Sequence, residues 1–164
     1  MDRVEKEATV RVLLTVARAD GVVDDDERRT LGVVAAAIGV PGPVDRTVDL
    51  EAELVRVRSP EARELLVTAA HAMANIDGRC TPEEYAILAR IHEVVWYDGM
   101  PDIEAAEREW ATRMSDVRDI MSRATAQFLH AVAALGDAPS VSYEALVQEL
   151  DGKKRAALGR ALGA

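Results

Sequence analysis

The chain has 164 residues; 49% are apolar, only 4% are aromatic, and the formal net charge is −9. This length suits one domain, which buries roughly 70% of its surface on folding. With so few aromatic residues, the core has to be built from Ala, Val, Leu, Ile and Met, which fill the seams between helices. The negative charge argues against a broad surface for nucleic-acid phosphates, because such a surface needs an excess of Lys and Arg.

The cellular compartment is indicated by cysteine usage and by the apolar runs. The lone Cys80 cannot form an internal disulfide, which favours a reducing compartment. The first residues do not resemble a signal peptide, and the longest apolar run, residues 31–40, is too short to span a bilayer. We therefore expect a cytoplasmic protein without a membrane span.

The first two elements are predicted as helices from caps and apolar periodicity. Asp2 can cap a helix that runs to about residue 19. The pair Asp20-Gly21 ends this helix, since Gly tolerates the left-handed conformation found at helix C-termini. Asp24 then caps a second helix that runs to residue 39, and Glu27 is placed to complete a capping box.

The middle of the chain alternates breaks with capped helices. Two prolines within residues 40–43 forbid a helix there, and residues 44–57 predict a weaker one. Ser59-Pro60 is a cap followed by a first-turn proline, and it starts a helix that ends at the second Asp-Gly. Thr81 opens the next helix with a second capping box and inward apolar positions up to Val95.

The last third keeps a helical period from residue 102 to residue 135. A break at Ser115-Asp116 would divide this stretch into two helices, and the sequence leaves both possibilities open. Residues 136–139 end the stretch, Ser142 caps a short helix, and Asp151-Gly152 predicts a turn before a last helix over residues 153–162.

No alternating strand pattern and no hairpin turn signal occurs in the sequence. We therefore predict an all-α, multi-helix bundle of about eight helices. Residues 1–100 form its helical core, and residues 101–164 form a C-terminal helical extension packed on the same domain.

One stretch occurs twice, with an offset of 57 residues. In each copy an apolar helical run ends at Asp-Gly, first at Asp20-Gly21 and then at Asp77-Gly78. A capping signal follows, with a Glu seven residues after the Asp, at Glu27 and Glu84. The apolar positions on both sides keep the same register, so we interpret the pattern as a duplicated helix-loop-helix hairpin.

The duplicated pattern resembles the TerB-like family of tellurite-resistance proteins over about residues 5–98. The resemblance implies an all-helical module with internal pseudo-symmetry that belongs to stress and resistance systems and acts by binding rather than by catalysis. It also implies that acidic residues hold a divalent metal. Carried over to this chain, the candidate ligands are Asp20, Glu27, Asp77 and Glu84, and Asp24 of the first loop is a further candidate. The chain departs from the family at Ile76, where Ala is usual, and its two copies differ where Thr81 replaces Asp24.

The acidic loops have two explanations that the sequence leaves open. Carboxylate oxygens suit Ca²⁺ or Mg²⁺ better than Zn²⁺, and the four acids of residues 24–27 exceed the two that capping needs. Capping alone accounts for the residue types and the spacing. A standard EF-hand is excluded because Val16 and Arg18 occupy its first and third ligand positions in the first copy. Whether the two loops share one site depends on the course of residues 40–59.

The other residues with reactive, ligating or basic side chains give weaker indications of function. No Glu-x-x-His pattern, Gly-rich phosphate loop or Gly-x-Ser-x-Gly motif occurs, so nothing in the sequence indicates an enzyme. His71 is expected to be partly buried or on the surface, and Cys80 to act as a small hydrophobe before a helix cap. The basic residues 153–160 and the helix before them resemble a helix-turn-helix pair, but the overall charge favours an acidic protein partner or a second copy over DNA.

These observations predict a non-enzymatic module that binds a divalent cation through the duplicated loops and acts through protein partners or self-association in a stress or resistance system. The alternative is a metal-free interaction scaffold that uses its acidic face and basic C-terminal tail.

Overall fold

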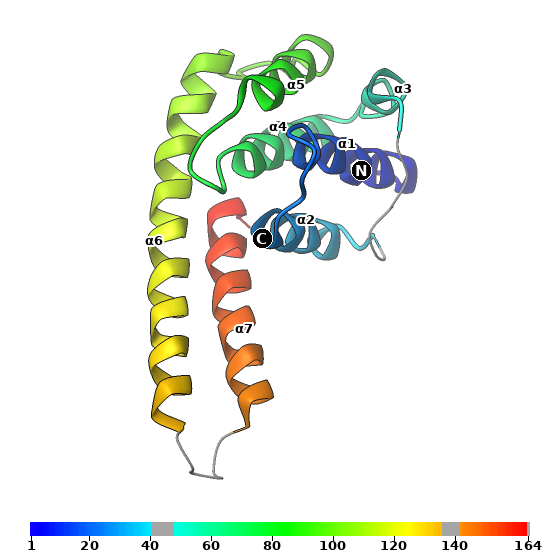
Figure 1. Ribbon diagram of the computed structural model, residues 1–164. Coiled ribbons are helices and arrows are strands. Elements are labelled where there is room, and N and C mark those ends of the chain that lie inside the picture. Colours follow the sequence, from blue (N-terminus) through cyan, green and yellow to red (C-terminus); the bar gives the residue numbers. More distant parts are fainter. Residues whose placement is uncertain (41–47, 136–141, 164) are drawn as a thin grey trace.

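The computed structural model describes residues 1–40, 48–135 and 142–163, which form seven helices and no strand (Figure 1). The all-α prediction is confirmed, and the helix number is close to the eight expected. Part of the predicted break at residues 40–43 and all of the one at residues 136–139 lie outside the described residues. The helices are α1 (Arg3–Ala17), α2 (Asp25–Ala37), α3 (Leu50–Leu54), α4 (Pro60–Ala74), α5 (Pro82–Val94), α6 (Ile103–Leu135) and α7 (Tyr143–Leu162).

The helix starts follow the caps that the sequence predicts. Asp2, Asp24 and Thr81 each form a complete capping box at the start of α1, α2 and α5. Ser59 caps α4, and its side chain accepts a hydrogen bond from the backbone of Ala62. Such caps satisfy the backbone N–H groups that the first helical turn leaves unpaired.

The bounds of the first two long helices recur 57 residues later. Both ends of α1 and α2 match those of α4 and α5 at this offset. Gly21 and Gly78 hold φ angles of 90° and 109°, a region that side chains beyond Gly adopt only with strain. The same turn therefore ends the first helix of each pair.

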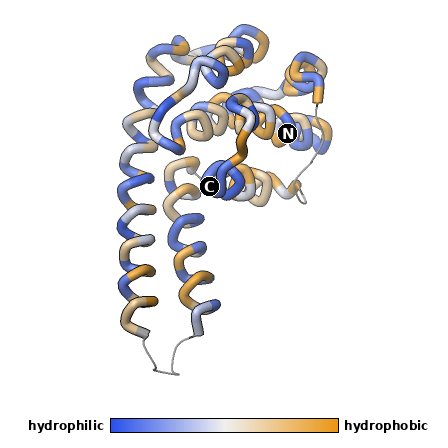
Figure 2. Tube along the Cα trace, viewed as in Figure 1, coloured by the Kyte–Doolittle hydropathy of each residue, from blue (hydrophilic) through white to orange (hydrophobic). Residues whose placement is uncertain are grey.

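The core lies between the two helix pairs. α1 packs on α4, α2 and α3, and α4 packs on α5 (Figure 1). Figure 2 shows hydrophobic and hydrophilic residues alternating along these helices, as expected for amphipathic helices with one buried face. The fully buried, large apolar side chains of this core are Val10, Val12, Leu13, Val16, Leu54, Leu66, Met73, Leu88 and Ile91.

Glu5 ties the starts of α1 and α4 together and was not singled out by the sequence. Its carboxylate accepts hydrogen bonds from the backbone N–H of Asp2 (2.9 Å), Arg58 (3.1 Å) and Ser59 (2.6 Å). These donors hold the pKa of Glu5 down at about 2, although burial acts in the opposite direction. Glu5 is thus ionised and fully engaged in the folded protein.

α6 and α7 form a long helical hairpin that packs against α4 and α2 and projects beyond them (Figure 1). α6 is unbroken through Ser115-Asp116, which decides between the two possibilities left by the sequence. α7 is also unbroken, so the predicted turn at Asp151-Gly152 and the helix-turn-helix-like pair are wrong. Asp151 instead binds Arg29 of α2 at 3.1 Å, and packing along α6 outweighs the low helix propensity of one Gly.

None of the described helices combines the length and the apolar character that crossing a membrane would need.

Candidate functional site

The first acidic loop connects α1 to α2. The Asp20 carboxylate accepts a hydrogen bond from the Val22 backbone at 2.9 Å, which stabilises the turn around Gly21. Asp24 accepts from the backbone N–H of Glu27 at 2.7 Å, and Glu27 accepts from the backbone N–H of Asp24 at 2.7 Å. Asp20 and Asp24 are exposed, whereas the Glu27 residue is buried.

The second acidic loop connects α4 to α5 and uses the same hydrogen bonds. The Asp77 carboxylate accepts from the Arg79 backbone at 3.0 Å. Glu84 accepts from the backbone N–H of Thr81 at 2.7 Å and from its hydroxyl at 2.9 Å. Like its counterpart in the first loop, Glu84 is buried while Asp77 is exposed.

The pKa values link the two loops electrostatically. Burial, followed by the charges of Asp24, Asp20 and Glu84, raises the pKa of Glu27 to about 7, against the backbone hydrogen bond from Asp24 that lowers it. The pKa of Glu84 is also raised, first by burial and then by the charges of Asp77 and Asp20. Because charges act over short distances in water, this mutual effect means that both loops lie at the same end of the bundle. We call this group, Asp20, Asp24, Glu27, Asp77 and Glu84, the acidic corner.

The additional acids of the first loop have partners of their own. Asp25 pairs with Arg28 at 2.8 Å. Asp26 pairs with Arg29 and lies 3.6 Å from Lys154 of α7. The excess of acids over the needs of capping therefore serves ion pairs, one of which, Asp26–Lys154, docks α7 onto α2.

The carboxylates of the acidic corner are not arranged as a preformed metal-coordination site. Within the described residues, no three His, Cys, Asp or Glu side chains converge as ligands of one ion. Its carboxylates are instead oriented by the backbone N–H groups of the caps and turns. The donor chemistry suits a hard cation, but such an ion would need water molecules or reoriented side chains to complete its coordination.

Arg118 of α6 is a neighbour of the second loop that sequence reasoning missed. Its guanidinium donates a hydrogen bond to the Asn75 carbonyl at 2.6 Å. A side chain added at Gly78 would lie 3.4 Å from the same guanidinium. Its sequence position, 43 residues after Asn75, gives no local signal of this contact.

A second polar group is buried between α4, α5 and α6. The Nε2 atoms of His71 and His92 are 2.8 Å apart, and Nδ1 of His71 lies 3.3 Å from a Glu107 carboxylate oxygen. His71 is fully buried, contrary to the expectation of a partly buried or surface side chain. Burial and the neighbouring His71 lower the pKa of His92 to about 4. One proton between the facing Nε2 atoms makes a hydrogen bond between His71 and His92. The row Glu107–His71–His92 thereby links α6, α4 and α5, and we call it the buried strut.

Cys80 lies beside this strut and is half-buried against the core, in agreement with its expected role as a small hydrophobe. Burial and the charges of Glu107 and Glu84 raise the pKa of its thiol to about 12. A protonated thiol is a poor nucleophile, so this environment does not activate Cys80.

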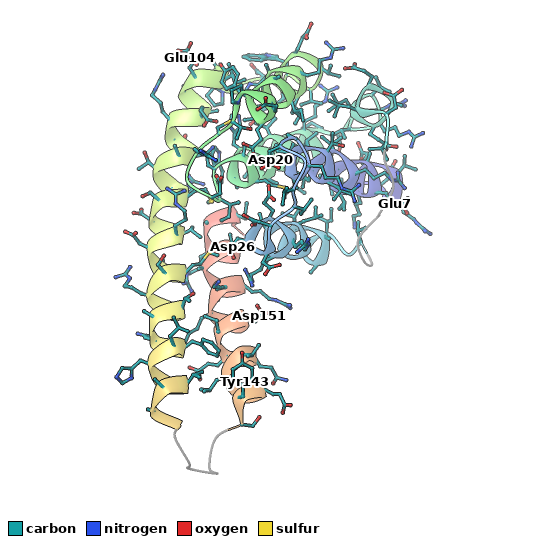
Figure 3. All side chains as sticks on the ribbon, in the orientation of Figure 1. Glu7, Asp20, Asp26, Glu104, Tyr143 and Asp151 are labelled. Atoms are coloured by element: carbon teal, nitrogen blue, oxygen red, sulfur yellow. The ribbon has the colours of Figure 1, made fainter. Side chains whose placement is uncertain are left out.

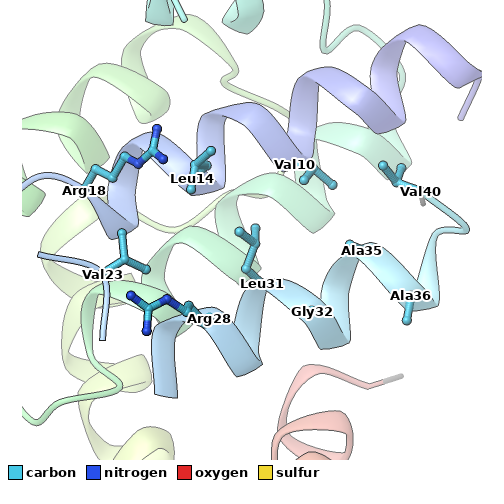
Figure 4. Close-up of a pocket in the computed structure, with 10 residues that line it drawn as sticks. All are labelled: Val10, Leu14, Arg18, Val23, Arg28, Leu31, Gly32, Ala35, Ala36 and Val40. Atoms are coloured by element: carbon cyan, nitrogen blue, oxygen red, sulfur yellow. The ribbon is translucent and has the colours of Figure 1, made fainter. Parts of the chain in front are cut away.

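A groove of about 650 Å³ lies between α1 and α2 (Figure 4). Val10, Leu14 and Leu31 give it an apolar floor, while Arg18 and Arg28 lie together at one end. Its size is that of a small-molecule site, although its lining carries no row of convergent polar groups.

Comparison with known proteins found no match among protein-family models, curated proteins or solved structures. The resemblance to TerB-like proteins therefore remains a prediction from the loop residues.

Proposed function

We propose that the protein is a non-enzymatic, TerB-like helical module in which the acidic corner takes up a divalent cation, Ca²⁺ or Mg²⁺, and which acts through protein partners in a stress or resistance response. The observation that carries the proposal is the electrostatic coupling between two loops 57 residues apart: the charge of Glu84 raises the pKa of buried Glu27, and the charge of Asp20 raises the pKa of buried Glu84. A cation between them would remove this repulsion.

The expected affinity is low. Coordination by caps and water is less rigid than a dedicated ligand cage, and loosely built calcium sites bind with dissociation constants of about 10⁻⁴–10⁻³ M. Binding at about ten times the dissociation constant would add about 1.4 kcal/mol to the free energy of unfolding. For a domain of this size, that is a rise of about 3–6 °C in Tm.

Thermal unfolding with Ca²⁺, Mg²⁺, Mn²⁺ or Zn²⁺ tests the proposal. Asp20→Asn and Glu84→Gln are expected to abolish the rise in Tm, because they remove one carboxylate from each loop. Asp25→Asn is the matched control, since it removes one negative charge from the start of α2, next to the acidic corner but not part of it. No rise with any ion, or an equal rise in all three variants, would refute cation binding at the corner.

A second candidate is a metal-free interaction scaffold that uses the acidic face and the basic C-terminal tail. One observation favours it: hydrogen bonds of caps and turns, together with the pairs of Asp25 and Asp26, occupy every acid of the first loop. A negative outcome of the ion titration would favour this scaffold.

A further inference from the structure

The far end of the α6–α7 hairpin has the composition of an interface, but among the residues that the structure describes it is covered only by its own two helices. We call residues 125–134 of α6 and residues 142–150 of α7 the hairpin tip. Residues 124–135 contain no Asp, Glu, Lys or Arg, the longest such stretch within a helix of this acidic chain. A helix without charge on any face is normally enclosed by other chain segments, because its apolar groups then leave water.

No residue of the hairpin tip is buried. Leu129, Tyr143 and Val147 are 59%, 59% and 39% exposed, and they account for three of the eight large hydrophobic residues exposed on the described surface. The Phe128 and Tyr143 rings meet at 6.0 Å, which joins the two helices but leaves most of the Tyr143 surface open. Figure 3 places Tyr143 at the end of the molecule opposite Glu104, away from the core.

The charges along the hairpin indicate what covers this surface. The tip carries only acids, Glu144 and Glu149, whereas the adjacent segment of α7 carries Lys153, Lys154 and Arg155. A shallow groove of about 380 Å³ lies between α6 and α7 beside this basic segment. Its lining combines small apolar residues with bases: Ile120, Arg123, Ala124, Lys153, Ala156 and Arg160.

We propose that the hairpin tip is a self-association surface, in which two copies of the chain pack their α6–α7 hairpins antiparallel about a twofold axis. The acidic tip of one copy then lies along the basic groove of the other, and its apolar side chains meet the uncharged part of α6. A parallel arrangement would instead place acids against acids. The exposed pairs Lys153–Glu149 and Arg155–Asp151 contribute little within one copy, so exchanging them across the interface costs little. The proposal is independent of cation binding at the acidic corner.

Sedimentation velocity and light scattering of the full chain over about a hundredfold range of concentration test for self-association. The wild-type protein is expected to form a reversible dimer, and Leu129→Asp to weaken it at least tenfold. Val4→Asp is the matched control: Val4 is an exposed apolar residue on α1, 54% exposed, outside the hairpin. A wild-type protein that stays monomeric, or a dimer that Leu129→Asp leaves intact, would overturn the proposal.

Charge reversal tests the antiparallel arrangement. Glu144→Lys with Glu149→Lys makes the tip basic, and Arg123→Glu with Lys153→Glu makes the groove acidic. Each double variant alone is expected to be monomeric, because like charges then meet at both ends of the interface. An equimolar mixture is expected to restore a dimer, since each tip again faces the opposite charge. Circular dichroism controls for folding; two folded variants that remain monomeric when mixed would refute the arrangement.

Discussion

Replacing Glu27 by Gln is expected to stabilise the protein at pH 8. Gln keeps the capping box, because its side-chain oxygen still accepts the backbone hydrogen bond that Glu27 accepts from Asp24. It removes the charge that burial and the neighbouring acids make unfavourable. The substitution therefore separates the electrostatic cost of this carboxylate from its role in the helix cap.

The size of the effect follows from linkage between protonation and folding. Glu27 has its pKa raised from 4.5 to about 7, so its contribution to stability is fully present below pH 4.5 and is lost as the pH rises to about 7. Each pKa unit corresponds to about 1.36 kcal/mol, which gives an upper limit of about 3.4 kcal/mol. Solvent screening of a carboxylate near the surface reduces this to about 1–2 kcal/mol. The expected rise in Tm at pH 8 is about 2–8 °C.

Thermal unfolding of wild type and Glu27→Gln at pH 4.5 and pH 8 is the assay. The two proteins should unfold at nearly the same temperature at pH 4.5, and the variant should unfold later at pH 8. Asp25→Asn removes the same charge from an exposed position and should give no such gain. A variant that is destabilised equally at both pH values would show that Glu27 carries no electrostatic cost, and the reasoning about the acidic corner would fail with it.

Three further outcomes test other parts of the structure. Glu5→Gln should lower the free energy of unfolding at pH 7 by about 1–3 kcal/mol, because the depressed pKa shows that the fold stabilises the carboxylate form. Urea unfolding should show this loss vanish as the pH approaches 2. His92→Asn should lower the free energy of unfolding by about 1–2 kcal/mol at pH 7.5, because it breaks the hydrogen bond to His71. The loss should be smaller toward pH 4. Below about pH 6.5 His92 takes up a proton in the unfolded wild type but not in the folded one, which itself destabilises the wild type. Gly152→Ala should raise the free energy of unfolding by about 0.5–1 kcal/mol, because Gly152 lies inside a helix with open space for a methyl group. Gly21→Ala should lower it by about 1–2 kcal/mol, because Gly21 has a positive φ. A change of the same sign in both variants would refute the continuous α7.

The features that the sequence predicted well depend on neighbouring residues. Asp24 and Glu27 form their capping box with groups three residues away, so their pattern is readable without any tertiary structure. The same holds for the turns at Gly21 and Gly78, which depend on the conformational freedom of a single residue. All helix starts predicted from such local signals within residues 1–95 agree with the structure, except that of the weak helix over residues 44–57. Its first four residues lie outside the described residues, and the described part contains the helix Leu50–Leu54.

The features that the sequence missed depend on packing between distant segments. Asp151-Gly152 has the composition of a turn, but Arg29 and the whole length of α6 hold it in a helix. His71 and His92 face each other because α4 packs on α5, and Glu107 reaches them only through the docking of α6. The acids of residues 24–27 suggested spare ligands, since Lys154, a partner of Asp26, lies more than a hundred residues away in the sequence.

The continuity of α6 makes it a rigid rod with one end fixed inside the protein. Glu107 lies at the buried strut, and Phe128, 21 residues further on, is about 30 Å away at about 1.5 Å per residue. A tilt of only about 5° at the fixed end would move the far end by about 3 Å, close to the width of a methyl group. Adjustments too small to disturb the core are thus amplified into displacements large enough to change which surfaces touch.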